Sequence, residues 1–314
     1  MIKNATFTLS VLVVVAAALT FPQFFSHIGE YKTTGLIVPL LMIIMFGMGT
    51  SVGVADFARV LKMPKSIAVG LVCQYTIMPF IGVSLALVSG FPPEIAAGII
   101  LMGCSPGGLA SNVMAYISDA NLALSLSLTV FSTLLAPFLT PLLMSWLAGQ
   151  HVPIDVVAMF WSITKIVILP VVAGLLFNHF LHGKFPLVDK NMPRLSMVGI
   201  VVIIGVITAA GRDNLITLGL ALVAIVVLQN LLGLALGYAV AKLAKMDESS
   251  ARAIAFEVGM QNSGLASGIA VEMGKVATMG IAPALFGPIM NVNGSILASI
   301  WRKNATQKTH QSSD

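Results

Sequence analysis

Long apolar stretches separated by short polar segments run through most of the chain. At about 20 apolar residues per membrane crossing, the pattern predicts ten helices, at 7–25, 34–54, 66–89, 94–116, 121–147, 155–178, 195–211, 214–242, 249–272 and 280–301. Only 9% of the residues are charged, against about 25% in a soluble domain. The sequence therefore predicts an all-α integral membrane protein, with residues 1–314 forming a single domain.

The basic residues are divided unequally between the segments that join these helices. With the amino terminus in the cytoplasm, Lys32, Arg212 and Lys275 fall outside, Lys165 lies within a helix, and the remaining 13 of the 17 basic residues fall inside. Cytoplasmic loops are enriched in Lys and Arg. We therefore expect a multi-pass protein of the inner (cytoplasmic) membrane, with both termini and the tail 304–314 in the cytoplasm. The charge of +5 then reports topology and indicates no nucleic-acid partner.

A short motif recurs at about half the length of the chain. Gly-Leu-Ala-Ser begins at Gly108 and again at Gly264, in the fourth and ninth predicted helices. Five helices in each half require the second copy to enter the membrane from the opposite side, so we expect inverted repeats over 1–148 and 155–303. The amino-terminal run also has signal-peptide character, but five spans per half favour a first membrane helix.

Glu257 is the most unusual residue in these segments, because it places a carboxylate inside an apolar helix. Such a charge costs about 2.5–3.5 kcal/mol and normally faces an ion, a partner or a cavity. In the opposing repeat, Pro106 removes a backbone donor, while Gly107 and Gly108 lower the cost of non-helical angles. We expect both helices to be interrupted, which frees carbonyls for a hard cation and half-helix amino termini for an anion.

Neutral oxygens are abundant near these expected interruptions. Hard cations prefer several oxygen ligands, and Ser125 and Thr129 share one helix face because they are four residues apart. Hydroxyls in membrane helices also bond within their own helix or to a neighbouring helix, so a structural role for these two stays open. With Glu257, one or two cation sites would draw on Gln74, Ser111, Asn112, Ser125, Thr129 and Gln261.

Two other functions are weighed against ion-coupled transport. A cation:proton antiporter of similar architecture commonly has more than one titrating carboxylate at its centre, and Glu257 is the only convincing candidate. An intramembrane metalloprotease needs clustered His and acidic ligands, but the histidines fall in loops, helix ends or the tail. Cys73 and Cys104 lie in apolar runs, so no Cys-rich metal site is expected. We therefore expect no enzyme, and no cofactor other than coupling ions.

Three motifs carry a resemblance to a known family: Glu257-Val-Gly-Met-Gln-Asn-Ser-Gly-Leu-Ala, Gly103-Cys-Ser-Pro-Gly-Gly and Ala110-Ser-Asn-Val-Met. Together they resemble the bile acid:sodium symporter family, in particular the bacterial homologues of the apical sodium-dependent bile acid transporter. The resemblance runs over all ten predicted helices. It implies a panel domain (helices 1, 2, 6 and 7) and a core domain (helices 3 to 5 and 8 to 10), with discontinuous helices 4 and 9 crossing.

The same resemblance implies two sodium sites and a substrate site. The first sodium site maps to Ser111, Asn112, Ser125, Thr129 and Glu257. The second maps to Gln74, Glu257, Val258, Met260 and Gln261, with Val258 and Met260 contributing backbone carbonyls. The substrate, in the crevice between panel and core, is expected to adjoin Leu109, Asn262, Met290 and Asn291.

Two of these positions depart from the family pattern. Leu109 stands where some relatives carry a small polar residue, and Met290-Asn291 stands where others carry a His-Asn pair. Both adjoin the expected substrate crevice. Substrate identity is therefore the feature that the resemblance transfers least well.

The expected function is secondary active transport, the sodium-coupled symport of an organic anion by alternating access. The expected partners are the anion, sodium ions and the lipid bilayer, and no obligate protein partner is inferred. The anion would be a bile acid-like steroid or a small organic acid such as pantoate. Two sodium ions beside one carboxylate leave a charge of about +1, which a monoanion neutralises, so net inward movement of positive charge is expected.

Overall fold

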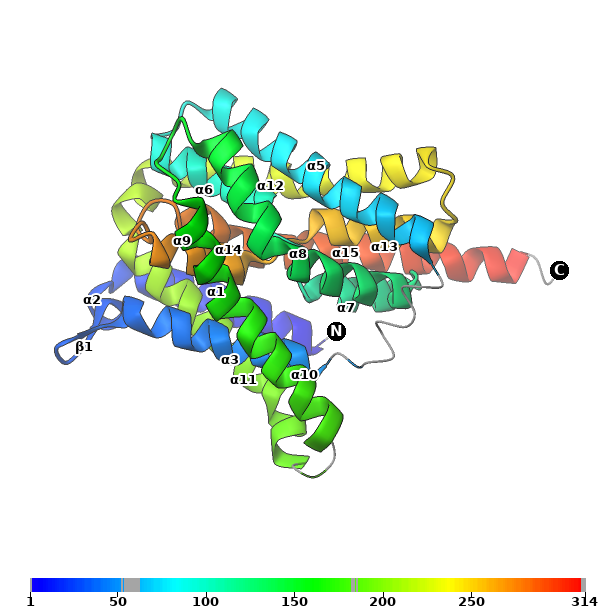
Figure 1. Ribbon diagram of the computed structural model, residues 1–314, viewed down its shortest axis with the longest axis horizontal. Coiled ribbons are helices and arrows are strands. Elements are labelled where there is room, and N and C mark those ends of the chain that lie inside the picture. Colours follow the sequence, from blue (N-terminus) through cyan, green and yellow to red (C-terminus); the bar gives the residue numbers. More distant parts are fainter. Residues whose placement is uncertain (1, 52, 54–62, 182–183, 185, 312–314) are drawn as a thin grey trace.

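The computed structural model describes residues 2–51, 53, 63–181, 184 and 186–311 (Figure 1). The described chain is predominantly helical, as predicted, with one short hairpin of β1 (His27–Ile28) and β2 (Tyr31–Lys32). The helices of the first half are α1 (Ile2–Thr20), α2 (Gln23–Ser26), the 3₁₀ turn η1 (Thr33–Leu36), α3 (Ile37–Thr50), α5 (Pro64–Ser89), α6 (Pro93–Cys104), α7 (Ala110–Ile117) and α8 (Leu122–Ala148). Those of the second half are α9 (Val156–Ile163), the π-helical turn η2 (Thr164–Ile168), α10 (Leu169–Leu181), α11 (Pro186–Ala210), α12 (Arg212–Leu243), α13 (Glu248–Gly259), α14 (Ser263–Glu272) and α15 (Ile281–Gln311).

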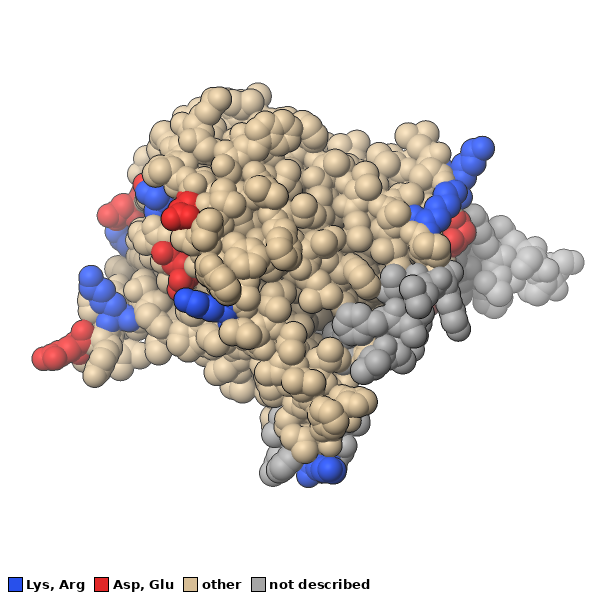
Figure 2. All heavy atoms as spheres, in the orientation of Figure 1, with Lys and Arg blue, Asp and Glu red and all other residues tan. Residues whose placement is uncertain are grey.

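The surface of the molecule is that of an integral membrane protein. Among the described residues, six helical stretches are long and apolar enough to cross a bilayer: Thr33–Thr50, Pro64–Ser89, Leu122–Ala148, Val156–Leu181, Arg212–Leu243 and Ile281–Lys303. Shorter apolar helices cover Leu9–Thr20, Pro93–Cys104 and Leu195–Ala210. In Figure 2 the charged side chains gather toward the two ends and the lower tip, leaving a wide uncharged band between them. The membrane class is therefore confirmed, and ten crossings remain a prediction.

Helix boundaries differ from the predicted ones where apolar content and helix length do not coincide. α1 ends at Thr20 rather than at residue 25, because Pro22 has no backbone N–H to continue the ladder. α11 begins at Pro186, nine residues before the predicted start, so it extends beyond its apolar portion. Lys165 lies in the π-helical turn η2, which no local pattern in the sequence predicts. Residues 52 and 54, at the predicted end of the second helix, lie outside the described residues.

The helices form two groups. α1, α3, α10 and α11 lie in the lower part of Figure 1, and α5, α6, α8, α12 and α13 lie in the upper part. Within the lower group, α3 packs closely on α10. A Cβ on Gly49 would lie 2.1 Å from the Val171 carbonyl oxygen, and one on Gly174 would lie 2.2 Å from that of Phe46. Glycine at both positions therefore permits this approach of two backbones.

Both predicted interruptions are present, and they lie against each other. The first separates α6 from α7, and the second separates α13 from α14. The Gly108 N–H donates to the Met260 carbonyl and the Asn262 N–H donates to the Pro106 carbonyl, each at 2.8 Å. This pair of antiparallel backbone bonds satisfies groups that the broken helices leave without partners.

Candidate functional site

The carboxylate of Glu257 lies at the meeting point of the two interruptions and is fully buried. Its Oε2 accepts hydrogen bonds from Ser111 Oγ at 2.8 Å and Thr129 Oγ1 at 2.9 Å, and its Oε1 accepts one from Ser132 Oγ at 3.4 Å. The ion pairs of the described residues, such as Arg252–Glu248, lie elsewhere. A buried carboxylate without a basic neighbour is costly, so this arrangement favours a cation beside it.

The hydroxyl groups around Glu257 have more hydrogen-bond acceptors within reach than they have protons to donate. Ser111 Oγ lies 2.8 Å both from Glu257 Oε2 and from the Gly108 carbonyl, yet it carries one proton. Thr129 Oγ1 is likewise within reach of Glu257, of the Ser125 carbonyl at 3.1 Å and of Asn112 Oδ1 at 3.3 Å. Ser125 Oγ donates to Asn112 Oδ1 at 2.8 Å. The structure thus brings together all five residues predicted for the first sodium site, as a cluster with surplus lone pairs.

Gly107 determines where the carboxylate can lie. A Cβ on Gly107 would be 1.9 Å from Glu257 Oε1 and 2.5 Å from its Cδ. The carboxylate therefore packs directly on the backbone of the interruption after α6. Sequence reasoning singled out this glycine only as a helix breaker, and its contact with Glu257 needs the three-dimensional structure.

The second group of predicted ligands lies beside the first, on the side of α5. Gln74 Nε2 donates to the Ser105 carbonyl at 2.9 Å and to Gln261 Oε1 at 2.8 Å, which leaves its buried Oε1 without a hydrogen-bond partner. Gln261 Nε2 donates to the Val258 carbonyl at 2.7 Å. The Met260 carbonyl accepts from Gly108 and keeps a second lone pair. A buried acceptor without a partner is rare, and a cation would satisfy it.

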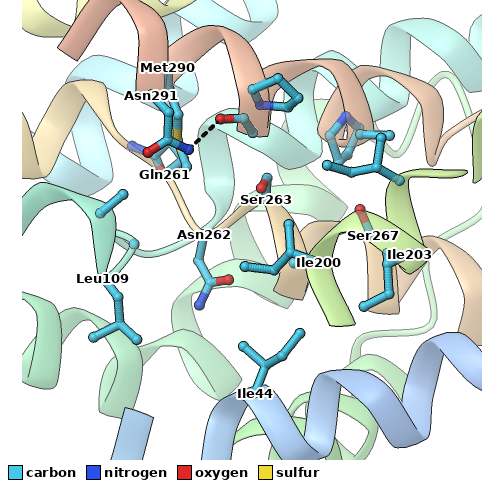
Figure 3. Close-up of a pocket in the computed structure, with 18 of the residues that line it drawn as sticks. Ile44, Leu109, Ile200, Ile203, Gln261, Asn262, Ser263, Ser267, Met290 and Asn291 are labelled. Carbon is cyan, nitrogen blue, oxygen red and sulfur yellow. Dashed lines mark hydrogen bonds between the residues drawn. The ribbon is translucent and has the colours of Figure 1, made fainter. Parts of the chain in front are cut away.

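A cavity of about 410 Å³ opens next to these clusters. It lies between α3 and α11 on one side and α7, α14, α15 and the two interruptions on the other. All four residues predicted to adjoin the substrate line it: Leu109, Asn262, Met290 and Asn291. Its opposite wall is apolar, with Ile44 and Met45 of α3 and Ile200 and Ile203 of α11. Figure 3 shows Asn262 pointing from the interruption into the cavity, toward Ile44 and Ile200.

The polar groups of the cavity suit an anion, although no Lys, Arg or His is among its described lining residues. Asn262 Oδ1 caps α14 by accepting from the Leu265 N–H at 3.0 Å. Its Nδ2 faces the cavity, where it lies 4.0 Å from the Met45 sulfur. The amino-terminal ends of α7 and α14 border the same space, and helix amino termini favour negative charge.

The cavity is open at one end and closed at the other. Along α11, exposure falls from 41% at Met197 to 4% at Ile203, and Val113 on α7 is 50% exposed. Toward the end of the molecule at which α11 and α14 end, polar contacts join α9 to α14 and α12 to α1. Ser162 of α9 donates to Glu272 Oε2 of α14 at 3.3 Å, and Arg212 Nε donates to the Leu19 carbonyl at 2.7 Å. Access is therefore from the end at which α11 begins and α7 ends.

Comparison with known proteins identifies the relatives of this chain. The profile of the Sodium Bile acid symporter family matches residues 38–218. The chain belongs to this family. In this member of the family, the matched segment contains the hydroxyl cluster of α7 and α8 and part of the cavity wall. Glu257 follows the matched segment.

Individual relatives extend the similarity over nearly the whole chain. This symporter-family protein is 40% identical over 304 residues to YocS of Bacillus subtilis, an uncharacterized sodium-dependent transporter, covering 96% of the present chain and 92% of YocS. It is 38% identical over 258 residues to the probable chloroplastic sodium/metabolite cotransporter BASS1 of rice, covering 82% of this chain and 64% of that protein. The corresponding Arabidopsis thaliana protein is 33% identical over 268 residues, which cover 85% of this chain and 67% of that protein.

These relatives decide between the function classes considered from the sequence. All are named transporters or cotransporters, so this member of the sodium bile acid symporter family is a transporter and not an enzyme. The cation:proton antiporter alternative is not favoured.

Sequence reasoning missed Ser132, although it follows Ser125 and Thr129 at the i, i+4, i+7 spacing of one helix face.

Proposed function

We propose that the protein imports an organic monoanion together with two sodium ions. The observation that carries the proposal is the buried Glu257 carboxylate, which has hydroxyl and amide oxygens around it and no ion pair to a described basic side chain. A sodium ion there would neutralise the carboxylate and use the surplus lone pairs. The anion would occupy the neighbouring cavity and complete the charge balance.

The two ions would share Glu257. The first would bind the oxygens of Ser111, Asn112, Ser125 and Thr129, which converge within hydrogen-bonding distance of one another. The second would bind the free Oε1 of Gln74, the side-chain oxygen of Gln261 and the carbonyls of Val258 and Met260. Both sets contain oxygens only, as hard cations prefer.

The cavity supports an anion with a polar head and an apolar body. The head would meet Asn262 Nδ2 and the amino-terminal ends of α7 and α14, while the body would lie against α3 and α11. Leu109 and Met290 add further apolar wall beside Asn291. A bile acid-like steroid or a smaller organic acid such as pantoate has this division of polar and apolar surface.

Transport would proceed by alternating access between two helix groups. We assign α1, α3, α9, α10 and α11 to a panel and α5 to α8 and α12 to α15 to a core, in ten membrane crossings arranged as inverted repeats over 1–148 and 155–303. With the predicted cytoplasmic location of both termini, the open end of the cavity faces the cytoplasm. The Ser162–Glu272 and Arg212–Leu19 contacts would then hold the outer end closed.

Uptake should depend on the membrane potential. The carrier returns with the single charge of Glu257 and crosses inward with two sodium ions and one monoanion, so one positive charge enters per cycle. This charge gains about 2.3 kcal/mol per 100 mV, which corresponds to roughly 50-fold greater accumulation. In proteoliposomes with a fixed sodium gradient, a potassium diffusion potential set by valinomycin should change the uptake of labelled taurocholate or pantoate by this order. Uptake indifferent to the potential would rule out the proposed stoichiometry.

The Gln74→Leu variant tests the second sodium site. It removes the free oxygen while keeping side-chain size, so we expect the sodium concentration that half-maximally stabilises the purified protein to rise about tenfold, in line with the worth of a hydrogen bond to a charged group. The measurement is thermal unfolding in NaCl against choline chloride at equal ionic strength.

Gln229→Leu is the matched control for this variant. Gln229 is also fully buried, donates to a carbonyl, that of Ile99 at 3.0 Å, and has an unpartnered Oε1, but it lies outside both clusters. We expect the control to lower thermal stability without changing the sodium midpoint. Equal shifts of the midpoint in the two variants would exclude Gln74 as a sodium ligand.

A further inference from the structure

We propose that Asn230 of α12 and Asn293 of α15 are positioning residues for the second sodium site and connect it to the substrate-facing side of α15. The inference rests on the proposed function, because it assumes that Val258 and Met260 contribute carbonyls to a sodium ion. Neither asparagine lines the cavity or contacts Glu257 in the described structure. Their role would be to hold in place the backbone from Val258 to Met260, which presents the two carbonyls.

Two hydrogen bonds in series lead from α15 to the interruption after α13. Asn293 Nδ2 donates to Asn230 Oδ1 at 2.8 Å, and Asn230 Nδ2 donates to the Gly259 carbonyl at 2.8 Å. Asn230 is fully buried and Asn293 is half-buried, so the Asn230–Gly259 bond forms away from water and the Asn293–Asn230 bond lies at the edge of the core. The Gly259 carbonyl belongs to the peptide plane that lies between the carbonyls of Val258 and Met260, so fixing it holds the middle of the backbone that presents them.

The same short stretch of backbone is packed as well as bonded. A Cβ on Gly259 would lie 2.5 Å from Leu234 of α12, and a Cβ on Gly294 of α15 would lie 2.9 Å from the sulfur of Met260. α12 and α15 thus enclose the segment from both sides. Glycine at 259 and 294 permits this close approach, and the two asparagines set the direction in which the carbonyls point.

α15 carries this connection to the cavity. Met290 lines the cavity and lies one helical turn before Asn293, so the two side chains are neighbours on the helix. A substrate that displaces or fixes α15 at Met290 and Asn291 therefore acts on the Asn293–Asn230 bond as well. By linkage, sodium at the second site and substrate in the cavity would strengthen each other's binding.

The test separates positioning from simple core stability. Asn293→Leu and Asn230→Leu each break the series, and we expect each to raise the half-maximal sodium concentration for thermal stabilisation about tenfold, measured in NaCl against choline chloride. The double variant should show about the same shift rather than a hundredfold one, because both substitutions break one chain of bonds. Ser299→Ala, on the same helix and bonded only to the Ser295 carbonyl, should leave the midpoint unchanged.

Uptake provides the second readout. In proteoliposomes, Asn293→Leu should regain the maximal rate of uptake of labelled taurocholate or pantoate at high sodium, to within about twofold of the wild type. Its substrate KM should fall less than the wild-type KM does as sodium is raised, because the link between the two sites is broken. Uptake that stays low at saturating sodium overturns the inference. So does a lower unfolding temperature with an unchanged sodium midpoint, which leaves the proposed function intact. If sodium fails to stabilise the wild-type protein relative to choline, both proposals fall.

Discussion

Glu257→Gln is expected to reduce sodium-driven accumulation of the organic anion at least about 100-fold. The substitution keeps the shape of the side chain but removes the one charge common to both proposed ion sites. At an effective dielectric constant of about 20, a charge at about 4 Å contributes roughly 4 kcal/mol to each ion. Even half of this, lost for two ions, exceeds the factor of 100. The measurement is uptake into proteoliposomes, with the sodium midpoint of thermal stabilisation as a binding readout.

Glu248→Gln is the control on the same helix. Glu248 is also a carboxylate of α13, but its side chain is 46% exposed and pairs with Arg252 at 3.0 Å and Lys242 at 3.4 Å. Exposed pairs of this kind contribute about 0–1 kcal/mol, so uptake should stay within about twofold of the wild type. If Glu257→Gln takes up the anion in a sodium-dependent way as well as Glu248→Gln and the wild type do, the Glu257 carboxylate has no part in sodium coupling.

The sequence predicted those parts of the site that have a local signal. A carboxylate in an apolar helix marked Glu257, and the Pro106-Gly107-Gly108 run marked one interruption. Each signal reflects the free energy that one residue costs its own helix. It can therefore be recognised in the sequence without knowing which other helices lie nearby. The meeting of α7, α8 and α13 around Glu257 has no such local signal. For that grouping, the resemblance of whole motifs was needed.

The apolar side of the cavity could not be predicted for a different reason. In a soluble protein, an apolar side chain is expected inside, but in a membrane protein the lipid-facing and cavity-facing sides of α3 and α11 use the same residue types. Ile44 and Ile200 face the cavity, whereas Leu220 and Val88 are strongly exposed on the surface. Composition alone does not separate these environments. The packing of the helices decides which apolar side chains face the cavity and which face the surface. It also decides that Asn293 meets Asn230.

The hydrogen bonds around Glu257 depend on neighbours from several helices, which the sequence alone does not bring together. Gln74 keeps a free Oε1 because the Ser105 carbonyl and Gln261 are bonded to its Nε2, and Ser111 has two acceptors for its single proton. Backbone direction matters equally, because the interruption after α13 presents carbonyls that α12 and α15 hold in place. The site is therefore formed by four or more helices together. It is most sensitive to substitution at the glycines where their backbones are in contact.

Gly107→Ala is the second substitution with a large expected effect, and it is expected to abolish sodium coupling without changing any proposed ligand. Its Cβ would overlap Glu257 Oε1, at 1.9 Å. The end of a side chain can move more easily than backbone, so the protein should fold while the carboxylate leaves its hydroxyl partners. We expect the sodium midpoint to rise at least tenfold and uptake to fall nearly as far as in Glu257→Gln. The two variants combined should be little worse than either alone.

Gly219→Ala is the matched control, since a Cβ there has nothing within 4 Å and the residue lies in the helix α12. Alanine in a helix is favoured over glycine by about 1 kcal/mol, so this variant should be as active as the wild type and slightly more stable. Gly108→Ala provides a contrast, because its Cβ would lie 2.7 Å from the Gln261 carbonyl, which is backbone. That variant should lose stability as well as transport. A folded Gly107→Ala protein with the wild-type sodium midpoint would show that the carboxylate does not need this position to couple sodium to transport.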